Sequence, residues 1–562
     1  MYKNLPEYIA TLEREGELRR IATPVSPILE ITEITDRVSK SPKGGPALLF
    51  ENVEGSTFPV VTNLMGSDRR IALALGAESL DDIASRLEGV LREAFVPRGS
   101  LAEKMRTLPL LTELARWFPK KSKGRGECQQ VVLQGGVEKL PVLKCWPHDG
   151  GRFVTLPLVH TAHPETGSRN VGMYRMQIFD DHTTGMHWHI HKTGALHYDA
   201  YKKAGITRMP VSVCLGGDPA YTYAATAPMP DGMDEYLLAG FLRRRPVRLV
   251  KCVTNDLWVP ADCDFVIEGW VDTTEPPRRE GPFGDHTGFY SLDDLYPVFH
   301  VEAITHRRDA IYPATVVGVP PQEDAWFAAA TERIFLPPIR FALQPEVTDL
   351  HMPPAGVAHN LAIVSMDTAY AGQPEKVAGA LWGAGQMMFN KVLVATPADF
   401  PIRDPEAVAR LLSGVDPARD FVFGHGVLDA LDHATATPGT GSKLLIDATG
   451  VKTNYQLSII NYQLNIDDGA KSLSPNEQLW LALANTDPAR DITIADGVAT
   501  IDARAKITGG EATPGRWPNV VVMDKSTVEL VDRRWPEYTL GALLPSPSDR
   551  YRKLLHSDGA AV

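Results

Sequence analysis

Short strand-like runs recur at fairly even spacing from Cys128 to about Val319 and are separated by Gly, Pro and Asp. They include CQQVVLQ, RFVTLPLVHT, NVGMYRMQIF, PVSVCLGG, DFVIEGWV and YPATVVGV. Evenly spaced strands divided by turn residues predict an all-β barrel or sandwich. One predicted helix, Met233 to Arg243, interrupts the pattern. The middle of the chain is therefore a β unit, and the segments on either side must pack around it.

The segment before this β unit mixes helices and strands. An amphipathic helix is predicted from Leu5 to about Ile21, and a second helix follows Ser79, which can cap it. Strand-like runs begin at Ala47 and Thr57 between the two helices. These elements predict a small α/β domain, and the Pro- and Lys-rich residues 117–125 predict a linker after it.

The segment after the β unit alternates predicted strands, at 359–366 and 390–397, with predicted helices, at 374–389 and 405–415. That order is typical of a parallel-leaning α/β domain. The chain has 562 residues, more than one hydrophobic core accommodates, so several domains are expected. The predicted class is a multidomain α+β protein. Its expected parts are an N-terminal α/β domain (1–125), a central β domain (126–320), a C-terminal α/β domain (321–480) and a C-terminal extension (481–562).

Composition and charge exclude several classes of protein. The net charge of −12 argues against a nucleic-acid partner, because such proteins usually carry a basic surface. No apolar run reaches the length of a membrane span, and the charged N-terminus does not resemble a signal peptide. The five cysteines form no CxxC pair, which favours reduced core residues of a cytoplasmic protein over disulfides. The chain also lacks GxGxxG, GxxxxGK[ST] and GxSxG motifs.

The stretch from Asn170 to His197 carries five histidines, three of which alternate at His187, His189 and His191. On a strand these three would face one side, whereas on a helix only the outer two would. One interpretation is a zinc site, because imidazole is a common metal ligand. The other is surface or hydrogen-bonded core histidines. No carboxylate that could serve as a further metal ligand lies close to these histidines in the sequence. The nearest candidate is Glu235 on the interrupting helix.

A second polar cluster brackets a GPFG turn with Glu280 and Asp285. Two acids held close together raise one another's pKa, so that one could stay protonated as a general acid. Alternatively, both are solvated loop carboxylates. Arg175, on the predicted strand NVGMYRMQIF, is either an exposed strand residue or a bidentate partner for a substrate carboxylate.

Long motifs that span most of the chain resemble those of the UbiD decarboxylases, the 4-hydroxy-3-polyprenylbenzoate decarboxylase family. They are NVGMYRMQ, MHWHIHKTGA, TAPMPDGMDEYLLAGFLR, EGPFGDHTGFY and WGAGQMMFNK, in the family's order. Other wording, such as EITDRVSKSPKGGPALLFENV, is similar to the menaquinone-biosynthesis branch. The resemblance implies a central split β-barrel like that of flavin reductases. It also implies that prenylated FMN binds in a cleft between the central and C-terminal domains. Mn²⁺ or another divalent cation, and K⁺ or Na⁺, would bind with it.

The resemblance also assigns roles to individual residues. Catalysis is implied for Arg175, Glu280 and Asp285, and metal binding for Asn170, His191 and Glu235. Residues implied to contact the cofactor are Met173, Tyr174, Arg175, His187, Trp188, His189, Lys192, Thr193 and Lys391.

The chain departs from better-known relatives at two places. His187 and His189 stand where ubiquinone-pathway members have Arg and Leu, so the contacts implied for these two residues are less secure. Asp285 stands where ferulate- and cinnamate-type members have Glu. A shorter carboxylate must lie nearer the substrate or act through water, which disfavours the acrylic-acid class of substrate.

These inferences predict non-oxidative decarboxylation of an aromatic acid, a (poly)prenylated hydroxybenzoate or dihydroxynaphthoate of quinone biosynthesis. No side chain supplies an electron sink for the aryl carbanion, so a cofactor must carry that step. Arg175 would orient the carboxylate, Glu280 would hold Arg175, and Asp285 would return the proton. Expected partners are a flavin prenyltransferase that supplies the cofactor and a second copy of the chain, in a homodimer or homohexamer. Peripheral membrane contact is expected if the substrate is polyprenylated.

Four alternatives remain open at this point. They are decarboxylation of a small phenolic or heteroaromatic acid, a split-barrel FMN oxidoreductase, a zinc hydrolase, and a non-catalytic flavin carrier. NAD(P)H oxidation would favour the oxidoreductase. Stoichiometric zinc without flavin would favour the hydrolase. Bound cofactor without CO2 release would favour the carrier.

Overall fold

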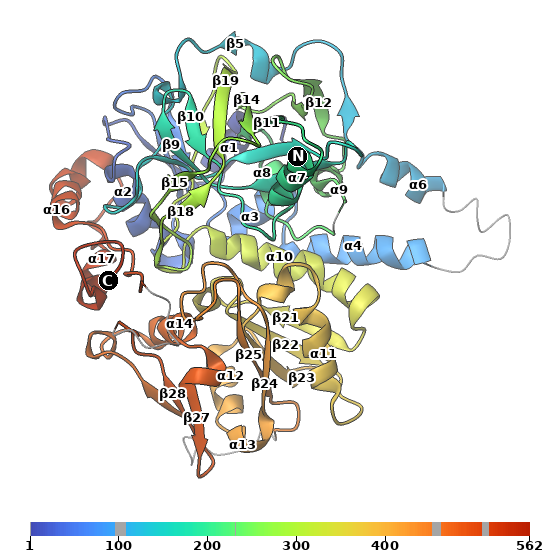
Figure 1. Cartoon of the computed structure of the whole chain (residues 1–562), viewed down its shortest axis with the longest axis vertical. Coiled ribbons are helices and arrows are strands. Elements are labelled where there is room, and N and C mark those ends of the chain that lie inside the picture. Colours follow the sequence, from blue (N-terminus) through green and yellow to red (C-terminus); the bar gives the residue numbers. More distant parts are fainter. Residues whose placement is uncertain (1, 96–107, 231, 452–461, 508–515) are drawn as a thin grey trace.

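The computed structural model describes residues 2–95, 108–230, 232–451, 462–507 and 516–562. Two bodies are stacked, and the helix α10 (Asp324–Pro338) runs between them (Figure 1). The upper body in that view contains the N-terminal and central segments, and the lower body contains the C-terminal α/β segment. The multidomain α+β class predicted from the sequence is confirmed.

The N-terminal segment forms a four-stranded sheet in the order β1-β2-β3-β20. Its strands are β1 (Leu18–Ile21), β2 (Ala47–Phe50), β3 (Val60–Thr62) and β20 (Tyr312–Pro313). The predicted helix from Leu5 to Ile21 is too long, because α1 (Leu5–Arg14) ends before Gly16, whose φ of 76° breaks the helix. The second helix is confirmed as α4 (Leu80–Phe95), and α2 (Glu30–Ser39) and α3 (Asp68–Ala74) complete the segment.

The centre of the upper body is a curled nine-stranded sheet in the order β6-β9-β10-β19-β14-β11-β7-β8, with β5 paired to β19. Every pair of neighbours in it is antiparallel. The strands are β5 (Val131–Val132), β6 (Phe153–Val154), β7 (Leu158–Ala162), β8 (Arg169–Met173), β9 (Met176–Asp180), β10 (Thr183–Gly185), β11 (Arg208–Leu215), β14 (Phe265–Asp272) and β19 (Val298–His306). The β unit predicted from strand spacing is therefore present as an open, half-barrel sheet.

Local structure in the central segment differs from the sequence prediction at three places. The run NVGMYRMQIF is two strands, β8 and β9, and Arg175 lies in the break between them. His187 to His191 lie on neither a strand nor a helix, and α7 (Thr193–Lys203) begins directly after them. The expected linker contains Trp117, which is buried against Phe241 with ring centroids 4.9 Å apart. The predicted interrupting helix is confirmed as α9 (Glu235–Arg243), and α8 (Pro219–Ala224) precedes it.

The lower body contains a five-stranded sheet in the order β21-β22-β23-β25-β24. The strands are β21 (Val347–His351), β22 (Leu361–Met366), β23 (Val392–Pro397), β24 (Phe421–Val427) and β25 (Thr440–Asp447). The three central strands are parallel, which agrees with the predicted parallel-leaning α/β domain. Helices α11 (Gln373–Trp382) and α12 (Pro405–Leu412) connect them where the sequence alternation predicts helices.

Residues from 462 onward, which we call the tail, follow this sheet. They form a small sheet of β26 (Tyr462–Asn465), β28 (Val498–Asp502) and β27 (Ile492–Ala495), and the helices α14 (Pro475–Asn485), α15 (Pro488–Asp491), α16 (Lys525–Arg534) and α17 (Ser548–Tyr551). Figure 1 shows α14 and β27 beside the lower body, whereas α16 lies beside α2 of the upper body.

Two global expectations can be compared with the structure. All five cysteines are buried and free, so the prediction of thiols rather than disulfides is confirmed. Among the described residues, no helix combines the length and the apolar character that a bilayer crossing requires.

Candidate active site

Arg175 is the centre of the candidate site. Its guanidinium group is nearly buried, with the side chain 8% exposed. Nε donates to Glu280 Oε1 at 3.0 Å and Nη2 donates to Glu280 Oε2 at 3.2 Å. Nη1 donates to Asp285 Oδ2, and Nη2 also donates to Ser291 Oγ at 3.0 Å. The structure therefore joins the two sequence motifs that carry the catalytic prediction.

Local structure explains how the two acids reach one arginine. Glu280 ends β15 (Arg278–Glu280), and Asp285 follows β16 (Phe283–Gly284). Between them, the Gly281 N–H donates to the Gln177 side chain at 2.7 Å, and the Gly284 N–H donates to Asp149 at 2.8 Å. These bonds hold the turn against Gln177 of β9 and against Asp149, and both carboxylates reach Arg175 in the break between β8 and β9.

The pKa values of the two acids move in the direction opposite to the sequence expectation. Burial acts to raise the pKa of Glu280, but the Arg175 charge and the bond to His187 outweigh it and lower the pKa to about 2. Burial likewise opposes ionisation of Asp285, and Arg175 again lowers the pKa below its usual value. The expectation that the acids raise one another's pKa is wrong for this arrangement, because a cation lies between them.

Two of the three alternating histidines extend the network. His187 Nδ1 lies 2.8 Å from Glu280 Oε2, and His187 Nε2 lies 2.6 Å from His189 Nε2. Burial lowers the pKa of both, to about 3 for His189, so both imidazoles are neutral near pH 7. A neutral His187 that donates Nδ1–H to Glu280 has an unprotonated Nε2, which accepts from His189. The pair therefore forms a continuous hydrogen-bonded chain to Glu280.

The third histidine does not join them. His191 points toward the lower body, where its ring centroid lies 6.0 Å from that of Phe389. Within the described ranges, no group of three or more His, Cys, Asp and Glu side chains could hold a metal. The trihistidine zinc hydrolase considered from the sequence is therefore not supported.

The predicted metal residues Asn170 and Glu235 lie close together on adjoining elements. Asn170 is buried on β8, and its amide donates to Thr161 Oγ1 at 3.4 Å. Glu235, the first residue of α9, accepts the N–H of the next β8 residue, Val171, at 2.9 Å. Burial raises the pKa of Glu235 to about 7, because the backbone N–H bonds and the Arg169 charge that act against it are weaker. No ion pair with Glu235 is found among the described residues. A buried carboxylate without an ion-pair partner in the described part of the chain fits a cation site.

The residues implied to line the cofactor surround the start of α7. Lys192 is the residue before the helix, and the helix lacks a capping side chain. The Tyr174 hydroxyl accepts the Gly194 N–H at 3.3 Å. The buried Nε1 of Trp188 has no hydrogen-bond partner within the described part of the chain. An uncapped helix start, an ammonium and an unused N–H fit a phosphate group.

Lys391 does not lie in this group. Its side chain is 1% exposed, and Nζ lies 2.6 Å from Asp432 Oδ2. Nζ also donates to the carbonyls of Leu483 and Thr486, at 2.8 and 3.2 Å. The implied cofactor contact therefore disagrees with this geometry, because the ammonium group of Lys391 pairs with Asp432 and donates to two carbonyls inside the lower body and the tail.

The structure adds residues that sequence reasoning did not select. His286 Nδ1 lies 3.0 Å from Asp285 Oδ1. Burial opposes its protonation, but the Asp285 bond and charge raise the pKa of His286 to about 9. Asp429 and His359 of the lower body interact electrostatically with His286. The position of His286 directly after Asp285 in EGPFGDHTG was an available signal, whereas only the fold brings Asp429 near.

Comparisons with known proteins agree with this site. Models of the 3-octaprenyl-4-hydroxybenzoate carboxy-lyase domains match residues 9–87 (N-terminal), 120–320 (Rift-related) and 325–448 (C-terminal). A protein of Aquifex aeolicus, described only as uncharacterized, is 50% identical over 451 residues, which cover 80% of this chain and 92% of that protein. One of Archaeoglobus fulgidus, also uncharacterized, is 47% identical over 450 residues, with the same shares covered.

Solved structures give the same result. Vanillic acid decarboxylase of Sedimentibacter hydroxybenzoicus, in its closed form, superposes with a TM-score of 0.70 at 26% identity, covering 82% of this chain and 95% of that one. The UbiD-class enzyme HmfF of Pelotomaculum thermopropionicum, in complex with FMN, gives 0.67 at 26% identity, covering 81% and 97%. Fold and site together define a carboxy-lyase. The chain belongs to the UbiD family.

Proposed function

We propose that this chain catalyses the prenylated-FMN-dependent, non-oxidative decarboxylation of an aromatic carboxylic acid. The observation that carries the proposal is the buried Arg175, which lies between Glu280 and Asp285. A guanidinium can bind a substrate carboxylate in a bidentate manner, and a neighbouring acid can return a proton. Structures of HmfF contain FMN in one case and prenylated FMN in another, which supports the cofactor assignment.

The residues around α7 fit such a cofactor. Lys192, Trp188 Nε1 and the uncapped start of α7 would hold the phosphate, with Thr193, Tyr174 and Met173 beside them. A divalent cation such as Mn²⁺, with K⁺ or Na⁺ nearby, would neutralise Glu235 and bind Asn170. The third ligand that the resemblance implies is His191, whose ring centroid lies 6.0 Å from that of Phe389 in the lower body. When bound, prenylated FMN supplies the electron sink that decarboxylation of an aryl acid requires.

Arg175 binds the carboxylate by exchanging one partner. Glu280 contacts it through two hydrogen bonds, whereas Asp285 contacts only Nη1. We infer that the substrate carboxylate replaces Asp285 at Nη1 while Glu280 keeps the guanidinium in place. Asp285 then loses the Arg175 contact, the largest influence that lowers its pKa, so its pKa rises and it can accept the proton that it passes on.

The proton comes from the Asp285–His286 pair. His286 carries a proton near neutral pH because its pKa is raised to about 9 by its bond to Asp285. Once CO2 has left, the proton of His286 passes to the Asp285 carboxylate, which delivers it to the substrate carbon and leaves His286 neutral. His187 and His189 extend the hydrogen-bonded chain from Glu280.

The substrate class is a (poly)prenylated hydroxybenzoate or dihydroxynaphthoate of quinone biosynthesis. The family description, which names a 3-octaprenyl-4-hydroxybenzoate, and the menaquinone-branch wording of the N-terminal motifs support it. A small phenolic acid is the second candidate, because vanillic acid decarboxylase has the same fold. Further proposals are a flavin prenyltransferase as cofactor supplier, a homodimer or homohexamer, and peripheral membrane contact for a polyprenylated substrate.

Co-expression with a flavin prenyltransferase tests the proposal. The purified protein should show the absorbance of the modified flavin and release CO2 from at least one member of a panel of prenylated and unprenylated aromatic acids. The same protein should not oxidise NAD(P)H, which separates it from a split-barrel FMN oxidoreductase. Retained cofactor with neither CO2 release nor H/D exchange on any acid would support a flavin carrier instead.

A further inference from the structure

The loop that carries Asp285 is a tight turn. The Asp285 N–H donates to the Phe289 carbonyl at 3.1 Å, and the Gly288 N–H donates to the Asp285 carbonyl at 3.0 Å. We call residues 284–290 the acid loop. Because the turn closes on Asp285 itself, any displacement of residues 287–289 changes where the carboxylate points.

Trp480 of the tail holds the outer side of this turn. Its indole Nε1 donates to the Thr287 carbonyl at 2.8 Å, and its side chain is almost fully buried. Its ring packs on Phe289 with centroids 5.4 Å apart. Gly288 has a φ of +83°, and a Cβ there would lie 2.5 Å from Trp480 Cζ2. The acid loop and Trp480 are therefore in direct contact through a hydrogen bond and through packing.

A second tail segment pairs with the same loop. The Val521 N–H donates to the Gly288 carbonyl at 2.9 Å, and the Tyr290 N–H donates to the Asn519 carbonyl at 3.1 Å. Asn519 is itself fixed, because its buried amide donates to Ser557 Oγ at 2.8 Å and to the Gly559 carbonyl at 2.7 Å. The acid loop therefore pairs with tail residues 519–521, and this segment is held in turn by tail residues 557–559.

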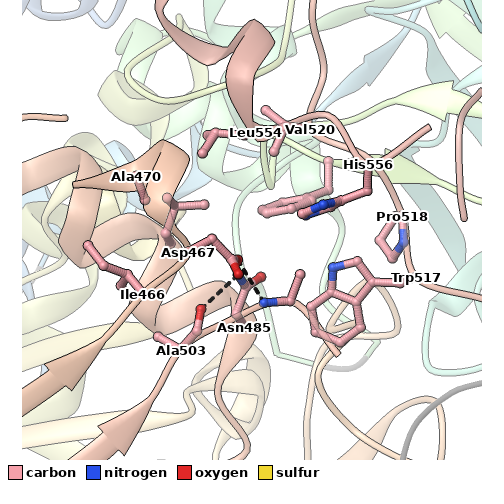
Figure 2. Close-up of a pocket in the computed structure, with 13 residues that line it drawn as sticks. Ile466, Asp467, Ala470, Asn485, Ala503, Trp517, Pro518, Val520, Leu554 and His556 are labelled. Atoms are coloured by element: carbon pink, nitrogen blue, oxygen red, sulfur yellow. Dashed lines mark hydrogen bonds between the residues drawn. The ribbon is translucent and has the colours of Figure 1, made fainter. Parts of the chain in front are cut away.

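Packing behind the loop leaves little freedom. Figure 2 shows the cavity that tail residues such as Trp517, Val520 and His556 form there, and Phe289 of the acid loop also lines it. The cavity holds about 10 Å³, which is the space of one water molecule. A well-packed contact of this kind transmits displacement rather than absorbing it.

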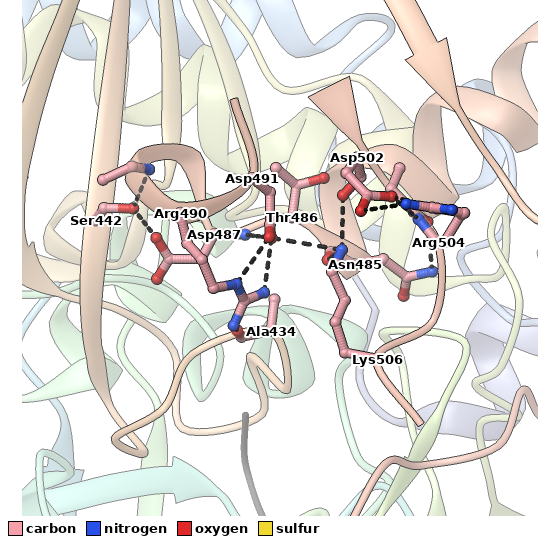
Figure 3. A network of polar contacts seen from close by, with 12 residues as sticks. Ala434, Ser442, Asn485, Thr486, Asp487, Arg490, Asp491, Asp502, Arg504 and Lys506 are labelled. Atoms are coloured by element: carbon pink, nitrogen blue, oxygen red, sulfur yellow. Dashed lines mark hydrogen bonds and ion pairs between the residues drawn. The ribbon is translucent and has the colours of Figure 1, made fainter. Parts of the chain in front are cut away.

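The tail is anchored on both bodies, so it can act as a fixed support. On the lower body, Arg490 donates to the Ala434 carbonyl at 2.8 Å and Ser442 Oγ accepts the Ala489 N–H at 2.8 Å, as Figure 3 shows in part. On the upper body, Arg37 pairs with Asp532 at 2.6 Å. Further contacts join Glu30 to Arg534 and Tyr538.

We propose that the tail positions the proton-donating Asp285, with Trp480 as the main positioning residue. The tail lies beyond the matched carboxy-lyase domains, which end at residue 448. Within those domains His433 packs on Phe289, with ring centroids 4.4 Å apart, but the hydrogen bonds to the Thr287 and Gly288 carbonyls come from the tail. The proposal rests on the proposed catalytic role of Asp285. Through the Thr287 and Gly288 carbonyls, the tail sets the distance between the Asp285 carboxylate and Arg175.

Trp480→Phe tests this, because it removes the indole N–H and keeps an aromatic ring. Trp535→Phe is the matched control. Trp535 is also almost fully buried, and its indole N–H donates to a carbonyl at 3.1 Å, but that carbonyl is Ala542 of the tail itself. Both variants are compared with the wild-type, flavin-loaded full chain by amide hydrogen exchange, kinetics and thermal unfolding. Trp480→Tyr, which also lacks the N–H but fills more space, serves as a second variant if Trp480→Phe does not fold.

Trp480→Phe should speed amide exchange in residues 285–291 about fivefold, the effect of losing one buried hydrogen bond. It should lower kcat while leaving KM and flavin content close to wild type, and Trp535→Phe should change neither exchange in this loop nor kcat. Unchanged exchange and kcat in Trp480→Phe, or equal effects of both substitutions, would overturn the proposal. If the loop exchanges as expected but the wild type decarboxylates no acid, positioning is supported and only the proposed function fails.

Discussion

Glu280 contacts Arg175 with both carboxylate oxygens, at 3.0 Å from Nε and 3.2 Å from Nη2, whereas Asp285 contacts a single nitrogen. The two acids, equivalent in the sequence motif, therefore differ in the structure. Glu280 is a fixed partner of the arginine. Asp285 can leave it when a substrate carboxylate arrives.

Glu280→Gln tests the fixed contact. The amide keeps one acceptor for Arg175 but removes the charge, so the guanidinium is buried with less compensation. We expect kcat to fall by about 10²-fold or more because the substrate carboxylate is held in the wrong place. Steady-state kinetics of flavin-loaded protein measure this. Glu302→Gln, which removes a charge from an exposed ion pair with Arg208, is the control and should keep wild-type rates.

Asp285→Asn tests the proton donor. An amide cannot deliver the proton, so turnover should fall by about 10²- to 10⁴-fold, the usual contribution of a general acid. Flavin content must be equal in variant and wild type. The control is Asp293→Asn, which also removes an acid, from a partly exposed ion pair with Arg279. Wild-type turnover in fully loaded Asp285→Asn would exclude Asp285 as the acid.

His286 predicts an alkaline limit of activity and stability. Its pKa in the folded protein is raised from 6.5 to about 9, so its contribution to stability is complete below pH 6.5 and is lost as pH rises through about 9. The proton that Asp285 needs is lost over the same range. A plot of kcat/KM against pH should therefore fall near pH 9. His286→Asn should lack this limb and show lower activity at pH 7, and an unshifted limb in that variant would assign it to another group.

The sequence predicted much of this site because its chemistry lies in contiguous motifs. Arg175, Glu280 and Asp285 were recognisable before the fold was known, and strand spacing located the β unit that joins them. The pKa direction of the acids was not predictable, since it depends on the arginine between them rather than on their separation along the chain. The ion pair of Lys391 was not predictable from the sequence either. Its motif is local, but its partner Asp432 is brought to it only by the folded lower body.

Glu235 predicts a stability change that depends on metal. Its pKa is raised from 4.5 to about 7 by burial, so the metal-free protein loses stability as pH rises from about 4.5 through 7, where the folded state must ionise the carboxylate. Glu235→Gln should abolish that loss and should also prevent Mn²⁺ from raising the Tm at pH 8. Calorimetry of metal-free protein with and without Mn²⁺ measures both effects. Glu165→Gln, an exposed acid, should behave as wild type.

Lys391 and Asp432 form a buried ion pair. Substitution of the pair tests whether Lys391 has a structural role or binds the cofactor. Both side chains are 1% exposed, so Lys391→Met leaves an uncompensated carboxylate and should lower the free energy of unfolding by about 3–5 kcal/mol. The double variant Lys391→Met with Asp432→Asn removes that charge and should recover most of the loss, as urea denaturation would show. Flavin retained after gel filtration should match wild type in the double variant, because among the described residues Lys391 binds Asp432 and the carbonyls of Leu483 and Thr486. Loss of flavin from a stable double variant would return Lys391 to the cofactor site.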